Sequence, residues 1–223
     1  MKKAVERFFR IGLWLSVLLI WFGAYRQPVS NMMNTFMIVG CVLLVFPVVW
    51  LGRTVLDKQP TTDRVAWTTI FVHYTLGILF GVAIIRAIIT RQDWTGWTIP
   101  IPAEIGLLLV VISGVVGLLT VANLAIKGLG APFAIALSEK LAIDWFYAWT
   151  RNPMVLATLA LLLSLGIWFQ STLFVLWVLI LFTPALLVFV KVYEERELEI
   201  RFGTSYVEYK SRTPMLFPRK PGN

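Results

Sequence analysis

Charged residues, cysteine and histidine are scarce in this sequence of 223 residues. Only 14% of the residues are charged, and there is one cysteine, Cys41, and one histidine, His73. Soluble domains carry about 25% charged residues. A single cysteine excludes an intramolecular disulfide, and one residue of each kind falls short of the four ligands of a typical His/Cys metal site. We therefore expect no metal centre, and we expect Cys41 to be a buried packing residue.

Apolar residues make up 58% of the chain, and its mean hydropathy is +0.79. A helix needs about 20 apolar residues to cross the hydrocarbon core. The sequence predicts an all-α integral membrane protein with about six (five to six) transmembrane helices, which ends in a helical hairpin and a cytoplasmic cap. The last two helices must form the hairpin, because only "QST" separates them. The predicted helices span 8–25, 33–51, 65–89, 104–126, 153–169 and 173–190.

Basic residues are distributed unevenly between the two sides of this predicted topology. With the N-terminus inside, only Arg26, Arg86 and Arg91 of the 20 lysines and arginines fall toward the outer side. This asymmetry predicts that both termini are cytoplasmic. It also accounts for the net charge of +8, together with anionic headgroups, without a nucleic-acid partner. Arg86 lies near enough to the outer edge that we expect its side chain to snorkel there.

The predicted third helix contains three residues that could serve packing or function. Gly77 and Gly81 form a GxxxG pair, which we expect to support helix packing within the molecule more than dimerisation. His73 has no carboxylate or cysteine beside it at membrane depth, so we interpret it as a hydrogen-bonded packing residue rather than a catalyst.

A polar cluster, "YAWTRNPMV" (147–155), precedes the predicted fifth helix. Asn152 is a good N-cap, and Pro153 suits the first helical position. The free N–H groups of this helix start and the charge of Arg151 together predict a small anion-binding mouth. The alternative is that Arg151 only follows the positive-inside rule, and these residues alone do not decide between the two.

Two carboxylates, Glu194 and Glu195, lie within one turn of the end of the predicted sixth helix. Carboxylates at that position oppose both insertion and the anionic membrane surface. A solvated continuation of the helix accounts well for Glu197 and Glu199, but less well for this pair. We expect the hairpin to bring the pair beside the anion-binding mouth, where the two together suit a zwitterionic or mixed-charge ligand.

Three stretches resemble the membrane methyltransferases related to isoprenylcysteine carboxyl methyltransferase and phospholipid N-methyltransferases. They are "GLGAPF" (128–133), "YAWTRNPM" (147–154) and "EERELEIRFGTSYVEYKSRTPMLFPR" (194–219). The third is similar to the family pattern Glu-Glu-x-x-Leu-x-x-x-Phe-Gly-x-x-Tyr-x-x-Tyr. The resemblance covers about residues 127–223. It divides the chain into N-terminal transmembrane helices (1–126) and a methyltransferase core (127–223).

The resemblance implies S-adenosylmethionine as cofactor and S-adenosylhomocysteine as product. This cofactor carries a carboxylate, an ammonium and a sulfonium, which agrees with a mixed-charge site. The resemblance also implies that Phe202, Gly203, Tyr206 and Tyr209 form a folded cap, and that Arg151 and Glu194 are the catalytic candidates. The cofactor-binding candidates are Tyr147, Arg151, Asn152, Pro153, Glu194, Glu195 and Tyr206.

The chain departs from the family pattern at a few positions. Val155 stands where the family has a tyrosine, and "IDWFY" (143–147) stands where relatives tend to have a glycine-containing turn. Isoprenylcysteine enzymes have histidine at the position of Asn152, whereas asparagine is common in bacterial relatives. These departures argue against isoprenylcysteine as the substrate more than they argue against S-adenosylmethionine as the cofactor.

The sequence therefore predicts a methyltransferase of a bacterial inner membrane that acts on a lipid or lipid-anchored acceptor entering from the bilayer. Nothing in it decides between O- and N-methylation. One alternative is a sterol-reductase-like enzyme that uses a nicotinamide cofactor, and a binding test with the two cofactors separates them. Another is a transporter or scaffold, which the absence of paired polar residues at mid-membrane depth disfavours.

Overall fold

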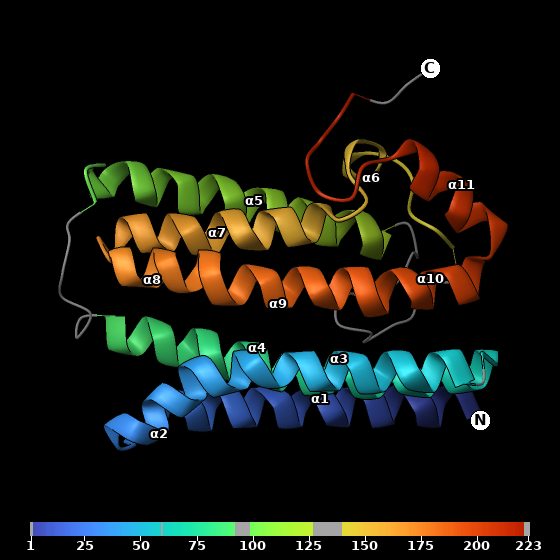
Figure 1. Cartoon of the computed structure of the whole chain (residues 1–223), viewed down its shortest axis with the longest axis horizontal. Coiled ribbons are helices and arrows are strands. Elements are labelled where there is room, and N and C mark those ends of the chain that lie inside the picture. Colours follow the sequence, from blue (N-terminus) through green and yellow to red (C-terminus); the bar gives the residue numbers. More distant parts are fainter. Residues whose placement is uncertain (1, 59, 92–98, 127–139, 221–223) are drawn as a thin grey trace. The chain divides into compact units, whose positions relative to one another are not determined.

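The computed structural model of the chain consists of helices joined by turns and loops, with no strand, in the parts that it describes, which are residues 2–58, 60–91, 99–126 and 140–220 (Figure 1). Five helices are long and apolar enough to cross a membrane, and a sixth, Pro153–Trp168, is apolar but shorter. This confirms the predicted all-α membrane fold with five to six spans. The long helices are Phe9–Arg26, Asn31–Lys58, Asp63–Thr90, Ala103–Ile126 and Thr172–Phe202.

Two of the long helices are built from several segments. The second long helix consists of α2 (Asn31–Thr35), a π-helical turn and α3 (Cys41–Lys58), and the last consists of α8, α9 and α10 with π-helical turns between them. The remaining helices are continuous. Their bounds, and those of the segments of the last helix, are α1 Lys2–Arg26, α4 Thr62–Thr90, α5 Ala103–Ile126, α6 Phe146–Trp149, α7 Pro153–Trp168, α8 Thr172–Trp177, α9 Thr183–Val188, α10 Glu195–Phe202 and α11 Thr204–Arg212.

The turn between α7 and α8 forms where "QST" predicts it. Gln170 has a positive φ of 53°, which reverses the chain direction. Ser171 caps α8, because its side chain accepts a hydrogen bond from the N–H of Phe174. An added Cβ on Gly166 would contact Val175 at 2.5 Å, so this glycine lets the two helices approach closely. The predicted hairpin is thus confirmed from its turn to the first part of the last helix.

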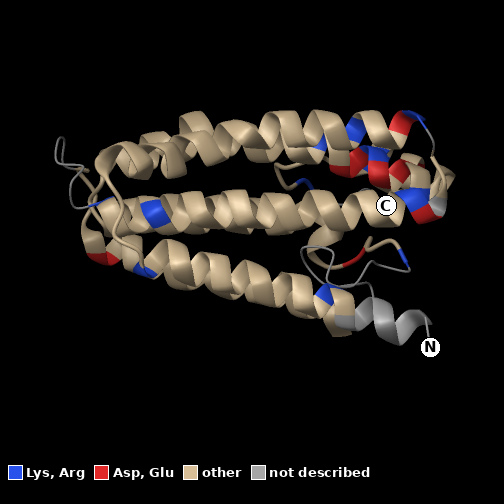
Figure 2. Cartoon of the chain, turned by 90° about the horizontal axis from the view of Figure 1, so that it is seen from below, with Lys and Arg blue, Asp and Glu red and all other residues tan. Residues whose placement is uncertain are grey.

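The described residues form two compact units, and the last long helix takes part in both. The first unit contains α1 to α4 and residues 184–197, and the second contains α5 to α8 and the chain from residue 198 onward. Charged residues lie mainly near the ends of the helices, whereas the middles of the helices carry few charges (Figure 2).

In the first unit α1 packs against α4 through two tryptophans and two glycines. A Cβ added to Gly77 would come within 2.9 Å of Trp14, and one added to Gly81 would overlap the indole of Trp21. The indole N–H of Trp21 also donates a 3.0 Å hydrogen bond to the carbonyl of Gly77. The GxxxG pair therefore serves packing within the molecule, as predicted.

The prediction that Arg86 snorkels toward the outer edge is wrong. Its side chain is buried, with 6% of its surface exposed. Its Nε donates to the side-chain oxygen of Asn34 at 2.7 Å, and its Nη1 donates to the carbonyls of Ala24 and Gln27 at 3.1 and 3.3 Å. The carbonyls at the end of α1 lack helical partners and carry partial negative charge, so they compensate a buried guanidinium better than the bilayer edge would.

The other two packing predictions for this unit are confirmed. Cys41 is 8% exposed. The Nδ1–H of His73 donates to the Thr69 carbonyl at 2.9 Å, and the ring lies edge-on to Phe189 and Tyr193.

In the second unit α5 and α7 pack closely and antiparallel. Gly106 near the start of α5 faces the backbone of Trp168 at the end of α7, and a Cβ on Gly117 would lie 3.7 Å from Ala157. Because Gly106 has no side chain, the two backbones can come together at that level. The polar segment 147–152 leads directly into α7, so the packing of α7 on α5 fixes the position of its last residue.

Candidate functional site: the start of α7 and the C-terminal segment

The polar cluster at the start of α7 binds the C-terminal segment of the chain, residues 210–219. The N–H of Arg151 donates to the Pro214 carbonyl at 2.9 Å, and the N–H of Arg219 donates to the Trp149 carbonyl at 3.0 Å. The hydroxyl of Thr150, which is buried, donates to the Met215 carbonyl at 3.1 Å. The cluster therefore has a structural partner that sequence reasoning did not identify.

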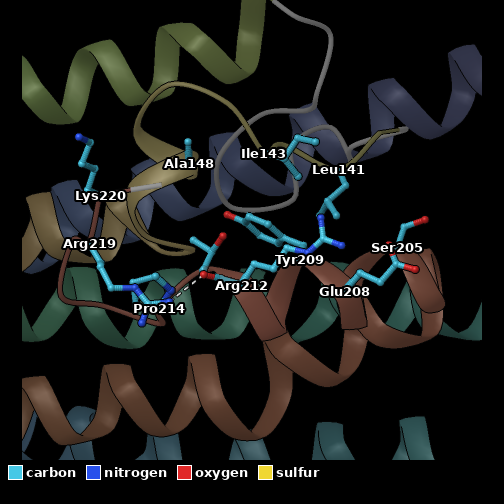
Figure 3. A pocket seen from close by; sticks show the side chains of 11 residues that line it. Leu141, Ile143, Ala148, Ser205, Glu208, Tyr209, Arg212, Pro214, Arg219 and Lys220 are labelled. Atoms are coloured by element: carbon cyan, nitrogen blue, oxygen red, sulfur yellow. Dashed lines mark hydrogen bonds between the residues drawn. The ribbon is translucent and has the colours of Figure 1, made fainter. Parts of the chain in front are cut away.

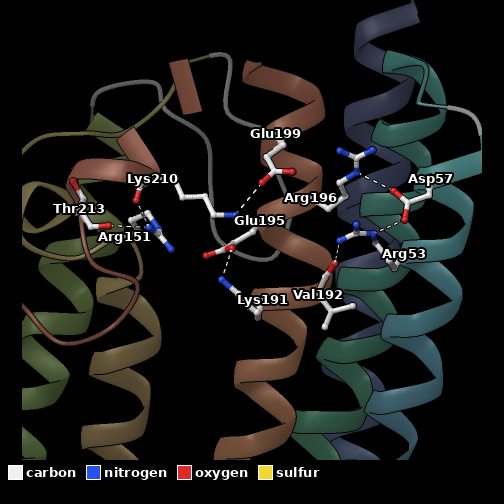
Figure 4. A network of polar contacts seen from close by, with 10 residues as sticks. All are labelled: Arg53, Asp57, Arg151, Lys191, Val192, Glu195, Arg196, Glu199, Lys210 and Thr213. Carbon is white, nitrogen blue, oxygen red and sulfur yellow. Dashed lines mark hydrogen bonds and ion pairs between the residues drawn. The ribbon is translucent and has the colours of Figure 1, made fainter. Parts of the chain in front are cut away.

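The Arg151 side chain holds the end of α11. Its Nη1 donates to the carbonyls of Lys210 and Thr213 at 2.7 and 2.8 Å (Figure 4). These carbonyls lie at a helix C-terminus, where backbone acceptors lack helical partners and a cation is favourable. The guanidinium thus joins the start of α7 to the cap, in addition to any role toward an anion.

Asn152 occupies the N-cap position of α7 and Pro153 the first helical position, as predicted. The Asn152 side chain, however, makes no capping hydrogen bond. Its Nδ2 instead donates to the Met215 carbonyl at 2.9 Å. The predicted cap interaction is wrong, because the carbonyl of the C-terminal segment offers the amide a longer-range partner.

The tyrosines of the cap lie close to the same segment. Tyr206 is 2% exposed, and its ring centroid lies 6.2 Å from that of Tyr209. The hydroxyl of Tyr209 donates to the carbonyl of Tyr147 at 2.7 Å. Burial raises the pKa of Tyr209 well above its usual range, although the positive charge of Arg151 opposes the shift. The phenol is therefore a stable donor at neutral pH.

Two residues of this region have a backbone conformation that strongly favours glycine. Gly203, between α10 and α11, has φ 54° and ψ −130°, and Trp145, just before α6, has φ 52° and ψ −124°. A side chain costs about 1–3 kcal/mol in such a region. The strain at Trp145 coincides with the stretch "IDWFY", where relatives tend to have a glycine-containing turn.

The carboxylates of the second motif belong to the first unit. Glu195 is 2% exposed and pairs with Lys191 at 3.2 Å, whereas Glu194 is partly buried. Glu197 is only 3% exposed, so its interpretation as a solvated residue is wrong. Burial of a carboxylate costs free energy unless the group is paired or hydrogen-bonded. Glu195 and Glu197 therefore need specific partners, unlike carboxylates on a solvent-exposed helix surface.

Two residues of α3, Arg53 and Asp57, form hydrogen bonds with the helix turn that carries these carboxylates. Asp57 accepts from Arg53 at 2.6 Å and from Arg196 at 2.9 Å, and Arg53 Nη1 donates to the Val192 carbonyl at 2.9 Å (Figure 4). Sequence analysis missed this arrangement, because Arg53 and Asp57 appear in the sequence only as an ordinary charged helix end. Glu199 forms a separate ion pair with Lys210 in the second unit, at 2.9 Å.

The start of α7 and the carboxylates Glu194 and Glu195 fall in one stretch that matches a known family. Residues 102–205 match the phospholipid methyltransferase family. This confirms the resemblance drawn from the motifs and indicates a membrane methyltransferase. A search of characterised proteins found no significant match to the chain.

The phospholipid methyltransferase match contains most of the candidate residues. It runs from the start of α5 into α11, and so includes Tyr147, the start of α7, Glu194 and Glu195, but ends one residue before Tyr206. "GLGAPF" (128–133) lies within the match but outside the described residues. The two carboxylates and Arg151 lie in different units, so their predicted proximity remains a prediction.

A hollow of about 420 Å³ with basic side chains on its rim lies beside the cap (Figure 3). Tyr209 and Glu208 of α11 line it, together with the basic side chains of Arg212, Arg219 and Lys220. The Nη2 of Arg219 donates to the Arg212 carbonyl at 3.0 Å, which fixes the C-terminal segment across one side. Anionic groups are the natural ligands of such a rim.

Proposed function

We propose that the protein transfers a methyl group from S-adenosylmethionine to a lipid or lipid-anchored acceptor at the cytoplasmic membrane face. The observation that carries the proposal is the phospholipid methyltransferase match over residues 102–205, which contains Arg151, Glu194 and Glu195. The acceptor atom is an oxygen or a nitrogen. A carboxylate acceptor needs no base, whereas a protonated amine must first lose a proton.

The proposed location follows from the charge distribution. Of the 20 basic residues, all but Arg26, Arg86 and Arg91 fall on the side that the predicted topology makes cytoplasmic. The start of α7 and the C-terminal segment then lie on the cytoplasmic side of a bacterial inner membrane, where a water-soluble methyl donor is available.

The side chains proposed to bind the donor fit its chemistry. Glu194 and Glu195 offer acceptors for an ammonium and for hydroxyls, and Arg151 at the start of α7 offers positive charge for a carboxylate. The proposed cofactor-binding site is completed by Tyr147, Asn152, Pro153 and Tyr206. When bound, S-adenosylmethionine supplies an activated methyl group on its sulfonium.

The proposed catalytic contribution of the protein is positioning and exclusion of water. Arg151 and Glu194 are the proposed catalytic residues, each acting on the bound donor by charge. Arg151 also acts as a positioning residue, because its hydrogen bonds hold the cap against the start of α7. Buried Tyr206 and the Tyr209–Tyr147 hydrogen bond keep this cap closed to water. Alignment in a dry site accounts for a large part of the rate of such transfers.

The decisive experiment is incubation of the purified protein with donor radiolabelled in its methyl group and with total membrane lipid. Label is expected in a lipid fraction, whose headgroup then identifies O- or N-methylation. A sample without lipid, and one with the variant Glu195→Gln, are the controls. Binding of a nicotinamide cofactor, with no binding of S-adenosylhomocysteine, would replace this proposal with the sterol-reductase-like alternative.

A further inference from the structure

An apolar groove of about 510 Å³ runs along α5 and α7 in the second unit. From α5 it is lined by Leu109, Ile112, Ser113 and Val116, which are spaced to lie on one face of a helix. Ile112 is half-exposed (50%), whereas Ser113 is 7% exposed and forms part of the floor.

The opposite side of the groove comes from α7, from Pro153 through Ala157 and Ala160 to Ser164. Ser164 lies eleven residues after Pro153, which corresponds to a length of about 17 Å along the helix. One leaflet of the hydrocarbon core is about 15 Å deep, half of the total thickness. The groove therefore extends about as far as one acyl chain reaches from the headgroup level toward the middle of the bilayer.

The hydroxyl groups along the groove are already used. Ser113 donates to the Leu109 carbonyl and Ser164 to the Ala160 carbonyl, each at 2.6 Å, and Thr150 donates to the Met215 carbonyl. The groove thus presents a hydrocarbon-like surface in a helix pair of membrane-spanning composition.

The end of the groove near the cap has the character of a membrane interface. Trp149, which is 47% exposed, and Pro218 line it there. Tryptophan is favoured at the headgroup level. The residue after Pro218 is Arg219, which lines the basic hollow together with Lys220. An apolar channel that ends beside basic side chains is complementary to a lipid with an anionic phosphate.

We infer that this groove binds one acyl chain of a phospholipid, with the lipid phosphate directed toward Arg219 and Lys220. Under the proposed function, on which this part of the inference rests, that phospholipid is the methyl acceptor. The chain length then contributes to substrate selection, because each further methylene buried in the groove strengthens binding.

The test uses the full chain in nanodiscs with a zwitterionic glycerophospholipid that carries a diazirine midway along one acyl chain. After illumination, the adducts are expected on Ile112, Val116 and Ala160, and several-fold fewer on Leu108 and Val111, which are exposed on α5 outside the groove. Equal labelling around α5 would mean ordinary surrounding lipid and would overturn the inference. Labelling of Leu108 with almost none of Ile112 and Val116 would mean that protein covers the groove, and would overturn it as well.

Two comparisons make the result specific. Ala160→Trp fills the groove and is expected to reduce groove labelling several-fold, whereas Val111→Trp, on the exposed side, leaves it unchanged. In the unaltered protein, an unlabelled phospholipid of ordinary chain length is expected to compete with the probe, and a six-carbon version with the same headgroup is not. Equal competition by the two would contradict the acyl-chain site even if Ala160→Trp failed to fold.

Labelling requires no methyl donor, so the two proposals can fail separately. Labelled groove residues without any methyl transfer would overturn the proposed function alone. Methyl transfer that is unaffected by Ala160→Trp, together with an unlabelled groove, would overturn this inference alone.

Discussion

The hydroxyl of Tyr209 donates a 2.7 Å hydrogen bond to the backbone carbonyl of Tyr147, and so joins the cap to the segment before α7. Tyr209→Phe removes this donor and leaves the carbonyl without it. Such a loss costs about 1–3 kcal/mol when the acceptor is buried. We expect faster hydrogen exchange in residues 204–219, with little change in α1. Tyr25→Phe, an exposed tyrosine, is the control.

The raised pKa of Tyr209 predicts the direction of the pH dependence of cap stability. The folded protein favours the neutral phenol more than the unfolded chain does, because the phenol is buried. The stabilisation is complete below the ordinary tyrosine pKa of about 10 and is lost as the pH rises above it. Hydrogen exchange of the cap, corrected for its intrinsic pH dependence, is expected to accelerate above about pH 10. Tyr209→Phe should weaken this acceleration, and an equal acceleration in the variant would contradict the assignment.

The two hydrogen bonds from Arg151 to the end of α11 predict that lysine is a poor replacement. Arg151→Ala is expected to lower affinity for S-adenosylhomocysteine and to expose the C-terminal segment to protease. Arg151→Lys restores charge but not the planar donor group, so it should recover both properties only in part. Full recovery in Arg151→Lys would indicate that only the positive charge matters. Arg26→Ala, at the far end of α1, controls for general loss of charge.

The proposed donor site predicts a binding defect in Glu194→Gln and Glu195→Gln. Loss of a hydrogen bond to a charged group removes about 1.5–3 kcal/mol, or roughly ten- to a hundred-fold in affinity. Calorimetric titration with S-adenosylhomocysteine measures this effect, and the thermal unfolding temperature checks that the variants fold. Glu104→Gln, at the start of α5, is the matched control. Unchanged affinity in both variants would remove the two carboxylates from the site.

The unfavourable backbone at Trp145 and the similar backbone at Gly203 predict effects of opposite sign. Trp145→Gly relieves strain and is expected to be more stable than Trp145→Ala by about 1 kcal/mol or more, because the alanine variant loses the same indole but keeps a Cβ. Gly203→Ala is expected to destabilise by a similar amount. Among the described residues no atom lies within 4 Å of a Cβ added there, so we attribute the effect to the backbone conformation. Thermal unfolding of the three variants provides the test.

Burial of Arg86 predicts that this position does not tolerate lysine. A lysine cannot reproduce hydrogen bonds from both Nε and Nη1, so Arg86→Lys should lower the thermal unfolding temperature of the first unit. A side chain that only snorkelled to the membrane edge would tolerate the change. Arg26→Lys, which is exposed, supplies the comparison.

The features predicted well from the sequence are those that depend on local composition. Apolar runs and Pro153 placed the starts of five of the six helices within three residues, because the bilayer permits few other backbone arrangements. The second and last helices, however, continue to Lys58 and Phe202, well beyond their predicted ends at 51 and 190. Gly77 and Gly81 were interpreted correctly, since small residues in a membrane helix usually serve packing.

The features predicted poorly depend on partners that are distant in the sequence. Arg86, Asn152 and Glu197 each had a plausible local explanation, in snorkelling, capping or solvation. Each instead lies partly or wholly buried, and the first two bond to groups more than 50 positions away. No periodicity marks such partners, so sequence reasoning could identify these residues as unusual without giving their contacts.

The attachment of residues 210–219 to the start of α7 has a consequence for biosynthesis. Arg151 and Thr213 are 62 positions apart, and every predicted membrane span precedes Thr213 in the sequence. The hydrogen bonds between Arg151 and this segment can therefore form only after every predicted span has been synthesised. A chain truncated after Phe202 would keep every predicted span and still lack the carbonyls of Lys210, Thr213, Pro214 and Met215, so the start of α7 would have none of its C-terminal partners.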